Sequence, residues 1–413
     1  MTARDLRRAG LWGRVVLPCL LAVVGMAAVQ LTRPLPAPVL TATQALPLTF
    51  PGHLALPWPD QGQGAVEAPG LAPMGGFGNP RPVPIASVAK VMTAYAILRD
   101  HPLGAGEEGP RIAVDARAVE DGRAVDESRI PGLREGQEFG QRDMLKMLLL
   151  PSANNIARLL ARWDTGTTTE DAFVARMNAA ARDLGMYDTT YTDPSGLDAD
   201  TVSTAADQLK LARAAMAAEA FREIVRLPAA TVDGLPAPLV NSNGLLPSSL
   251  GVRGIKTGSS TPAGGALMWA AYVDVGGSEQ PVLGVMLGQH ASGPDVDAGD
   301  SLALALDRSR TLVEAARAAL SERVVIAAGT AVGHLDDGLG TRTPVVAVED
   351  LRLPGVAGQQ LHMRLTGGPA GVTAARATAG TLTVSAGTVS RSVPVLLARE
   401  RTRPSVLSRL LWG

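Results

Sequence analysis

A run of seventeen uncharged residues, 15–31, follows arginines at positions 4, 7, 8 and 14, and it restricts where the rest of the chain can fold. Basic residues before an apolar run are typical of an export signal, and about seventeen residues is also the shortest length that spans a bilayer as a helix. Because basic residues stay on the cytoplasmic side, we expect everything after Arg33 outside. The sequence therefore predicts a signal peptide or signal anchor over residues 1–36.

Cleavage of this segment decides between an anchored and a secreted protein. No small-x-small cleavage site follows the apolar run closely, and the candidate Thr43-Gln44-Ala45 is distant from it. We expect an uncleaved anchor, with the protein on the outer face of the cytoplasmic membrane. Secretion after cleavage is the alternative, and a buried core helix is the least favoured interpretation.

The metal-binding and disulfide-forming residue types are few. The single cysteine, Cys19, lies inside the apolar run, so the exported part has no thiol for a disulfide. The five histidines are not at the close spacing of metal ligands; they are His53, His101, His290, His334 and His362. We therefore expect no metal and no cofactor.

The charge balance argues against nucleic acid as a partner. The 38 basic residues almost cancel the 39 acidic ones, and aromatic residues make up only 3% of the chain. Phosphate binding needs a basic excess and base stacking needs aromatic side chains.

Only four of the basic residues are lysines. Each lysine is of interest, because an amine can become a neutral base and a guanidinium cannot.

After a linker over residues 37–52, mixed helical and strand patterns predict an α/β domain over 53–321. Apolar residues at helical spacing predict helices at 87–100, 141–150, 170–184, 204–216 and 301–320. Apolar runs predict strands at 53–59, 64–71, 252–256, 267–275 and 282–287.

Beyond residue 321 the apolar period changes to two, which predicts a small β-rich domain over 322–400. Apolar segments on both sides of Ser385-Ala386-Gly387-Thr388 indicate a hairpin. Residues 401–413 form a tail with an apolar side, which we interpret as frayed rather than membrane-bound.

Three short strings in the α/β region carry residues suited to nucleophilic catalysis. They are Ser87-Val88-Ala89-Lys90 at a helix start, Ser152-Ala153-Asn154 after a helix, and Lys256-Thr257-Gly258 at the end of a strand. Each string alone is a weak signal, but together they use two of the four lysines. We therefore treat them as one constellation.

The chemistry of a serine nucleophile explains this combination. A serine hydroxyl needs a base, and positions i and i+3 of a helix share a face, so Lys90 can reach Ser87. That amine must be neutral, and burial and a second cation, Lys256, both lower its pKa. Lys256 and Thr257 offer a charge and a hydroxyl to a carboxylate, and the Asn154 amide can donate and accept. Gly258 leaves room for a substrate at the strand edge.

These strings resemble the motifs of penicillin-binding proteins and class A β-lactamases. The surrounding segments PIASVAKVMTAY, LLLPSANNIARLLA, GMYDTTYTDPSGLD and GIKTGSSTPAGGAL are similar to the D-alanyl-D-alanine carboxypeptidases of the low-molecular-mass penicillin-binding class. The resemblance covers residues 53–320 and, more loosely, the β-rich domain. It implies a sheet flanked by helices, with the active site between the sheet edge and a helical cluster.

The resemblance also implies a role for each motif residue. Ser87 would attack the penultimate D-Ala carbonyl of a peptidoglycan stem peptide and form an acyl-enzyme, with Lys90 as its base. Ser152 would relay a proton to the leaving amine. The substrate would be bound by Asn154, Lys256, Thr257 and Gly258, with the N–H groups of Ser87 and Ser259 as the oxyanion hole. β-Lactam antibiotics would acylate Ser87.

Ser195, in the DPSG string, is interpreted as a turn residue.

Three other functions stay open. A D,D-endopeptidase would use the same residues on cross-links. A class A β-lactamase needs an E-x-x-L-N string to activate the deacylating water, and the sequence lacks one after Ser152. A non-catalytic penicillin-binding module usually lacks one catalytic group, whereas all are present here.

Overall fold

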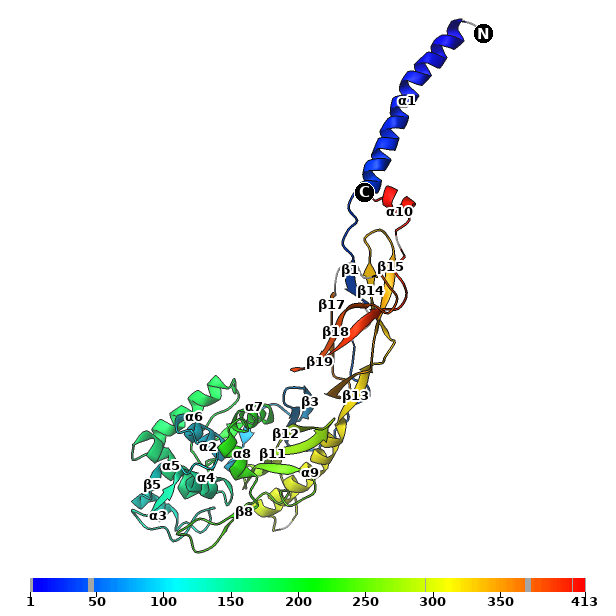
Figure 1. Cartoon of the computed structure of the whole chain (residues 1–413). Helices are drawn as coiled ribbons and strands as arrows, with labels where there is room; N and C mark the ends of the chain where they lie inside the picture. The colour runs from blue at the N-terminus through cyan, green and yellow to red at the C-terminus, as the bar shows by residue number, and fades with distance from the viewer. Residues whose placement is uncertain (1–2, 44–47, 294, 368–372, 403, 413) are drawn as a thin grey trace. The chain divides into compact units, whose positions relative to one another are not determined.

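The computed structural model describes residues 3–43, 48–293, 295–367, 373–402 and 404–412. The chain divides into two compact units, one of Gly52–Glu322 with Pro354–Gly358, and one of Met1–Pro51, Arg323–Leu353 and Gln359–Gly413. Figure 1 labels their helices and strands. The candidate cleavage sequence beginning at Thr43 continues into residues 44–47, which lie outside the described residues.

A five-stranded antiparallel sheet organises the larger unit, in the order β10-β11-β12-β2-β3. The strands are β10 (Val252–Ser260), β11 (Gly264–Val275), β12 (Ser278–Gln289), β2 (Gln63–Ala68) and β3 (Ala72–Phe77). The three strands expected over 252–287 are present and longer than predicted. Backbone pairing continues beyond the apolar runs; Ser259, for example, pairs with Gly265.

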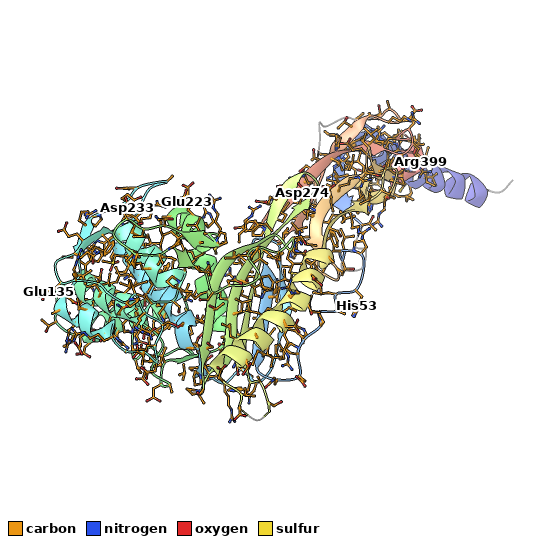
Figure 2. The ribbon with its side chains drawn as sticks, turned by 90° about the horizontal axis from the view of Figure 1, so that it is seen from below. His53, Glu135, Glu223, Asp233, Asp274 and Arg399 are labelled. Atoms are coloured by element: carbon orange, nitrogen blue, oxygen red, sulfur yellow. The ribbon has the colours of Figure 1, made fainter. Side chains whose placement is uncertain are left out.

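Both faces of this sheet are covered by helices. Residues 264–271 of β11 are all buried, which requires cover on each side. Helix α9 (Ala298–Ala319) packs against β11 and β12, and α7 (Ala205–Ala215) packs against β12 and β2. Figure 2 shows α9 lying along the strands. At Gly265 a Cβ atom would lie 1.9 Å from the carbonyl oxygen of Ser301, so glycine permits the close approach of α9.

The other helices of this unit share one buried apolar core with the sheet. They are α2 (Lys90–Asp100), α3 (Ala116–Asp121), α4 (Gln141–Leu149), α5 (Asn154–Thr165), α6 (Asp171–Asp183) and α8 (Glu219–Val225). Short strand pairs connect them: β4 (Val83–Pro84) with β7 (Val202–Ser203), β5 (Arg111–Ala113) with β6 (Glu138–Gly140), and β8 (Ala229–Ala230) with β9 (Leu239–Val240). The expected helices are present with slightly shifted ends. Helices α3, α5 and α8 were not among the expectations.

Of the two strands predicted at the start of this unit, the first is absent and the second is shorter than predicted. Residues 53–59 form no strand, because Pro57 and Pro59 have no N–H to donate to a ladder. The strand predicted over 64–71 ends at Ala68, and Leu71 already lies in the turn toward β3.

The smaller unit contains a six-stranded sheet in the order β1-β14-β15-β19-β18-β17. The strands are β1 (Val39–Ala42), β14 (Ala331–Asp336), β15 (Arg342–Ala347), β17 (His362–Gly367), β18 (Thr378–Ala386) and β19 (Val389–Leu397). The hairpin predicted around Gly387 is present, with Ala386 opposite Val389. Strands β13 (Leu320–Ile326) and β16 (Leu351–Val356) form a separate two-stranded sheet.

Residues 37–52, expected to be a linker, supply the edge strand β1 of this sheet and a buried core residue, Phe50. The sequence analysis did not predict β1. Its surroundings are rich in proline, and a four-residue strand has too few positions to establish an alternating pattern.

Helix α1 (Ala3–Thr32) contains the apolar run. Its window Val15–Thr32 has a mean hydropathy of 2.2, none of it is buried, and it is long and apolar enough to cross a membrane. The tail expected to be frayed contains a short helix, α10 (Val406–Leu410), that contacts α1. The Arg33 guanidinium lies 4.7 Å from the centre of the Trp412 ring.

The contact at Gly265 predicts a stability effect. We expect Gly265→Ala to destabilise the larger unit by about 1–3 kcal/mol, because the added methyl overlaps a backbone oxygen of α9. Thermal unfolding of the purified chain, followed by circular dichroism, measures the change. Gly244→Ala is the control, since its Cβ meets only a side-chain carbon at 3.7 Å. Equal unfolding temperatures for the two variants would contradict this account of the packing.

Candidate active site

Ser87 and Lys90 lie at the start of α2. Residues Ala86–Ala89 form a 3₁₀ turn that leads into the helix, and Lys90 Nζ lies 2.7 Å from Ser87 Oγ. The expected i, i+3 contact is therefore present. Ala86 holds the left-handed conformation at φ 45°, a strained backbone of the kind that clusters at functional sites. The Ser87 side chain is half-buried, whereas that of Lys90 is fully buried.

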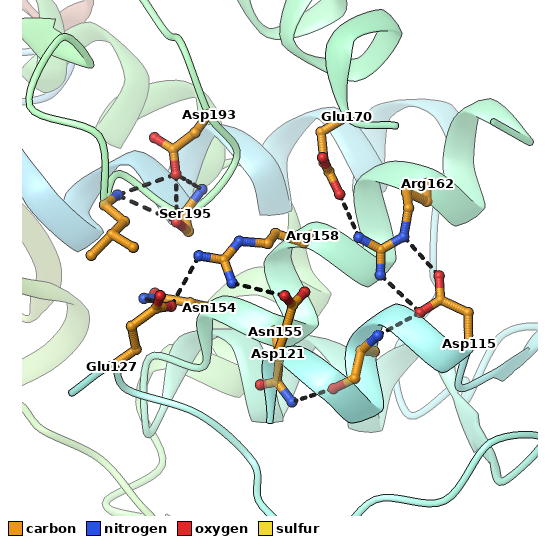
Figure 3. Close-up of polar contacts among 12 residues, drawn as sticks. Asp115, Asp121, Glu127, Asn154, Asn155, Arg158, Arg162, Glu170, Asp193 and Ser195 are labelled. Atoms are coloured by element: carbon orange, nitrogen blue, oxygen red, sulfur yellow. Dashed lines mark hydrogen bonds and ion pairs between the residues drawn. The ribbon is translucent and has the colours of Figure 1, made fainter. Parts of the chain in front are cut away.

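A turn over residues 193–197 supplies the second contact of Lys90. Its Nζ donates to the carbonyl oxygen of Ser195 at 2.8 Å. The Asp193 carboxylate accepts the N–H group of Ser195 at 3.0 Å (Figure 3). It also accepts the N–H group of Gly196 at 3.0 Å, and the two bonds fix this carbonyl in place. Ser195 is thus a turn residue, as expected, and its backbone orients the Lys90 amine.

Lys90 is held as a weak base by its surroundings. Burial is the largest cause that lowers the pKa of Lys90 well below its ordinary value, and the charge of Lys256 is the second. Asp193 and Glu127 raise this pKa and Arg158 lowers it, without reversing the direction. A neutral amine beside a serine hydroxyl can accept its proton.

The Lys256-Thr257-Gly258 string lies on β10, the edge strand of the five-stranded sheet. A Cβ at Gly258 would lie 3.0 Å from the carbonyl oxygen of Ile85 and 3.2 Å from the Ser87 nitrogen, so the strand runs directly against the 3₁₀ turn. Lys256 is buried and donates to the carbonyl oxygen of Thr257 at 3.1 Å. Burial lowers the pKa of Lys256 to about 7.

The Ser152-Ala153-Asn154 string connects α4 and α5. Ser152 is in the left-handed conformation at φ 68°, and Asn154 is the first residue of α5. Within the described part of the chain, Ser152 Oγ and Asn154 Oδ1 are buried and have no hydrogen-bond partner. Neither atom is used by the described fold. No hydrogen bond joins Ser152 to the other motifs among these residues.

The structure brings the three strings to one place. Ser87 touches Lys90 directly, Gly258 abuts the Ser87 turn, and the charge of Lys256 acts on Lys90. Asn154 is connected through Glu127, which accepts from its Nδ2 at 3.0 Å and also acts on the Lys90 charge.

Sequence reasoning missed two charged residues near these motifs, Glu127 and Arg158. Neither lies in a recognisable string, and only the folded chain brings Glu127 to the start of α5. Among the described residues, no three His, Cys, Asp or Glu side chains come close enough to hold a metal ion.

Comparison with known sequences gives one matching family profile. A profile described as D-alanyl-D-alanine carboxypeptidase matches residues 79–290, just over half of the chain. The D-alanyl-D-alanine carboxypeptidase DacB2 of Mycobacterium tuberculosis is 34% identical over 210 residues, which cover 50% of this chain and 67% of that protein. A D-alanyl-D-alanine endopeptidase of Pseudomonas aeruginosa is 41% identical over 129 residues, 31% of this chain and 38% of that protein.

Solved structures confirm the predicted α/β fold. The D-alanyl-D-alanine carboxypeptidase DacD from Francisella tularensis superposes with a TM-score of 0.58 at 19% identity, covering 86% of this chain and 96% of that one. The Streptomyces K15 DD-transpeptidase gives 0.54 at 24% identity, covering 62% and 96%. At these identities the likeness concerns the fold, a sheet flanked by helices.

Proposed function

Because this chain belongs to the family of D-alanyl-D-alanine carboxypeptidases, we propose that it is a serine carboxypeptidase that removes the terminal D-Ala from peptidoglycan stem pentapeptides. One observation carries the proposal: the Ser87 hydroxyl lies 2.7 Å from a buried lysine amine whose pKa is lowered. The chain spans only 38% of its Pseudomonas relative and 67% of its Mycobacterium relative, so the activity is argued from the site itself.

Acylation begins with proton transfer. Neutral Lys90 takes the Ser87 proton, and Ser87 Oγ forms a bond to the carbonyl carbon of the penultimate D-Ala. The N–H groups of Ser87 and Ser259 stabilise the oxyanion. As the C–N bond breaks, the proton passes through Ser152 to the leaving D-Ala amine. The free Oγ of Ser152 supports this relay, since no partner in the described residues competes for it.

Lys256 and Thr257 bind the terminal carboxylate of the substrate. Lys256 is buried without an ion-pair partner among the described residues, and a substrate carboxylate supplies that partner. Asn154 binds the peptide backbone. The edge position of β10 suits an extended peptide. Gly258 does not leave space for that peptide, contrary to the expectation from the sequence, because its missing side chain admits the 3₁₀ turn that carries Ser87.

Water then releases the shortened stem peptide and regenerates Ser87. β-Lactams carry a carboxylate and a reactive carbonyl, so they acylate the same hydroxyl as substrate mimics. We place the site on the outer face of the cytoplasmic membrane, with α1 as the anchor; its apolar window supports this placement.

A D,D-endopeptidase is the second candidate. Proteins named D-alanyl-D-alanine endopeptidase, from Pseudomonas aeruginosa and Escherichia coli, are 41% and 38% identical to this chain over 129 and 128 residues. The two activities use the same motif residues on different substrates. Mass spectrometry of a stem pentapeptide and a cross-linked dimer, each incubated with the protein, distinguishes them.

Loss of the Ser87 hydroxyl tests the nucleophile. We expect labelled penicillin to attach covalently to the native chain and not to Ser87→Ala, because the acyl bond forms at Oγ. Gel fluorescence and intact mass measure the adduct. The exposed Ser278 on β12 gives the control, since Ser278→Ala should label normally. Equal labelling of both variants would remove Ser87 as the nucleophile.

Lys256→Ala tests the carboxylate anchor. We expect kcat/KM to fall roughly 30-fold or more for a peptide with a free terminal carboxylate, because a charge-assisted contact is lost. The loss should be smaller for the same peptide with its terminus amidated. Any effect through the pKa of Lys90 is shared by both peptides, so their ratio isolates the anchor. Equal losses would show that Lys256 does not bind the carboxylate. Lys146→Ala, which removes a half-buried lysine paired with Asp143, serves as the control.

The lowered pKa values of Lys90 and Lys256 predict that kcat/KM first rises and then falls with increasing pH. The rate rises with pH as Lys90, whose pKa is lowered, loses its proton and becomes a base. For a free-carboxylate substrate it falls again as pH passes about 7, where Lys256 loses its charge. The amidated peptide should lack this falling limb. A falling limb of equal size with both peptides would contradict the assignment to Lys256.

A further inference from the structure

Both carboxylate oxygens of Asp193 are occupied by hydrogen-bond donors. The Oδ2 atom accepts from the N–H and the hydroxyl of Ser195 (Figure 3), and also from the N–H of Leu197 at 3.2 Å. The Oδ1 atom accepts from the N–H of Gly196 at 3.0 Å and from Thr201 Oγ1 at 2.9 Å. A carboxylate only accepts hydrogen bonds, so an amide of the same shape, which has one donating end, cannot replace it at both oxygens.

The turn that Asp193 organises is bonded to α2 at two successive carbonyl oxygens. Lys90 Nζ donates to the carbonyl oxygen of Ser195 at 2.8 Å, and Thr93 Oγ1 donates to that of Pro194 at 2.6 Å. Lys90 and Thr93 are one helical turn apart, so their side chains project from the same face of α2. The position of the turn therefore decides where the Lys90 amine finds its acceptor.

Thr201 connects the same carboxylate to the segment that carries Ser87. Its hydroxyl donates to the carboxylate, and its carbonyl oxygen accepts from the Ile85 N–H at 3.3 Å. Ile85 immediately precedes the 3₁₀ turn of Ser87. Gly196 permits direct contact between the two turns, since a Cβ there would lie 1.9 Å from the carbonyl oxygen of Ala86. One carboxylate is thus connected both to the acceptor of the amine and to the start of the nucleophile turn.

The charge of Asp193 opposes the use of Lys90 as a base. Burial and the charge of Lys256 lower the pKa of Lys90, and Arg158 also lowers it, whereas Asp193 and Glu127 raise it. The Lys90 amine itself contacts a hydroxyl and a carbonyl oxygen. What Asp193 offers the amine is therefore a fixed geometry.

We propose that Asp193 is a positioning residue for the base: it holds the Ser195 carbonyl against α2, so that the neutral Lys90 amine donates there and directs its lone pair at the nucleophile. Through Thr201 it also fixes the start of the Ser87 turn relative to that amine. This inference rests on the proposed function, in which Lys90 takes the Ser87 proton. Asp193 acts through the turn and does not touch the reacting atoms.

Asp193→Asn keeps the shape of the side chain and replaces one accepting oxygen with a donor. We expect the plateau of the second-order rate constant for acylation by labelled penicillin to fall roughly 10- to 100-fold, because the amine and the hydroxyl lose their alignment. Total labelling at long times counts the active molecules, so the rate refers to these alone. Asp198→Asn is the matched control and should acylate normally, since Asp198 is exposed in the same loop and its side chain accepts from the Asp200 N–H.

The pH profile of acylation separates positioning from a loss of stability. Because Asp193 raises the pKa of Lys90, Asp193→Asn should move the rise of the rate to lower pH while the plateau falls. A chain that is merely destabilised would show fewer labelled molecules, with the rise at its native pH. A plateau equal to that of the native chain, or a lowered plateau with the rise unmoved, would overturn the inference.

Thr201→Val tests the same contact without changing a charge, and it decides the inference if Asp193→Asn does not fold. Loss of the hydroxyl should lower the acylation plateau about threefold or more, because Oδ1 of Asp193 loses a donor. Thr201→Ser, which keeps the hydroxyl, should restore the native rate. A native rate for Thr201→Val would overturn the inference and leave the proposed function intact. A native full-length chain that does not react with labelled penicillin would overturn both.

Discussion

The contact between Ser87 Oγ and Lys90 Nζ places a strict demand on the fold, because the amine can serve as a base only while it is uncharged. A buried lysine without a carboxylate partner meets that demand, since the low-polarity interior disfavours its charged form. The fold gives Lys90 a neutral acceptor instead, the carbonyl oxygen of Ser195. Three elements surround this contact. The 3₁₀ turn carries Ser87, the 193–197 turn accepts a hydrogen bond from Lys90, and strand β10 carries Lys256, whose charge lowers the pKa of Lys90.

A second buried lysine, Lys256, acts on the charge of Lys90. The charge of Lys256 lowers the pKa of Lys90, so a charged Lys256 favours a neutral Lys90. Burial lowers the pKa of Lys256 to about 7, which leaves it poised near neutral pH. A bound carboxylate would favour the charged form of Lys256, and that charge in turn keeps Lys90 neutral. Under the proposed function, binding of a free terminus and activation of Ser87 would therefore be coupled.

The sequence predicted those parts of the fold whose cause is local. The contact of Ser87 with Lys90 follows from helical spacing, and the hairpin at Gly387 follows from two alternating segments and a turn. Strand β1 and the failed strand at 53–59 depended on pairing partners and missing N–H groups, which apolar patterning does not register. Glu127 could not be found because it reaches Asn154 from a loop 27 residues earlier in the chain, through a contact that only tertiary structure creates.

Hydrogen-bond occupancy differs among the polar residues around the three motifs, even where the residue type is the same. Asp193 uses its oxygens on the backbone of its own turn, and Asn155 uses both ends of its amide on neighbouring loops. Ser152 Oγ and Asn154 Oδ1 are buried with no partner among the described residues, a costly arrangement in a folded chain. Under the proposed function, a bound peptide would relieve that cost, and part of its binding energy would come from these polar atoms.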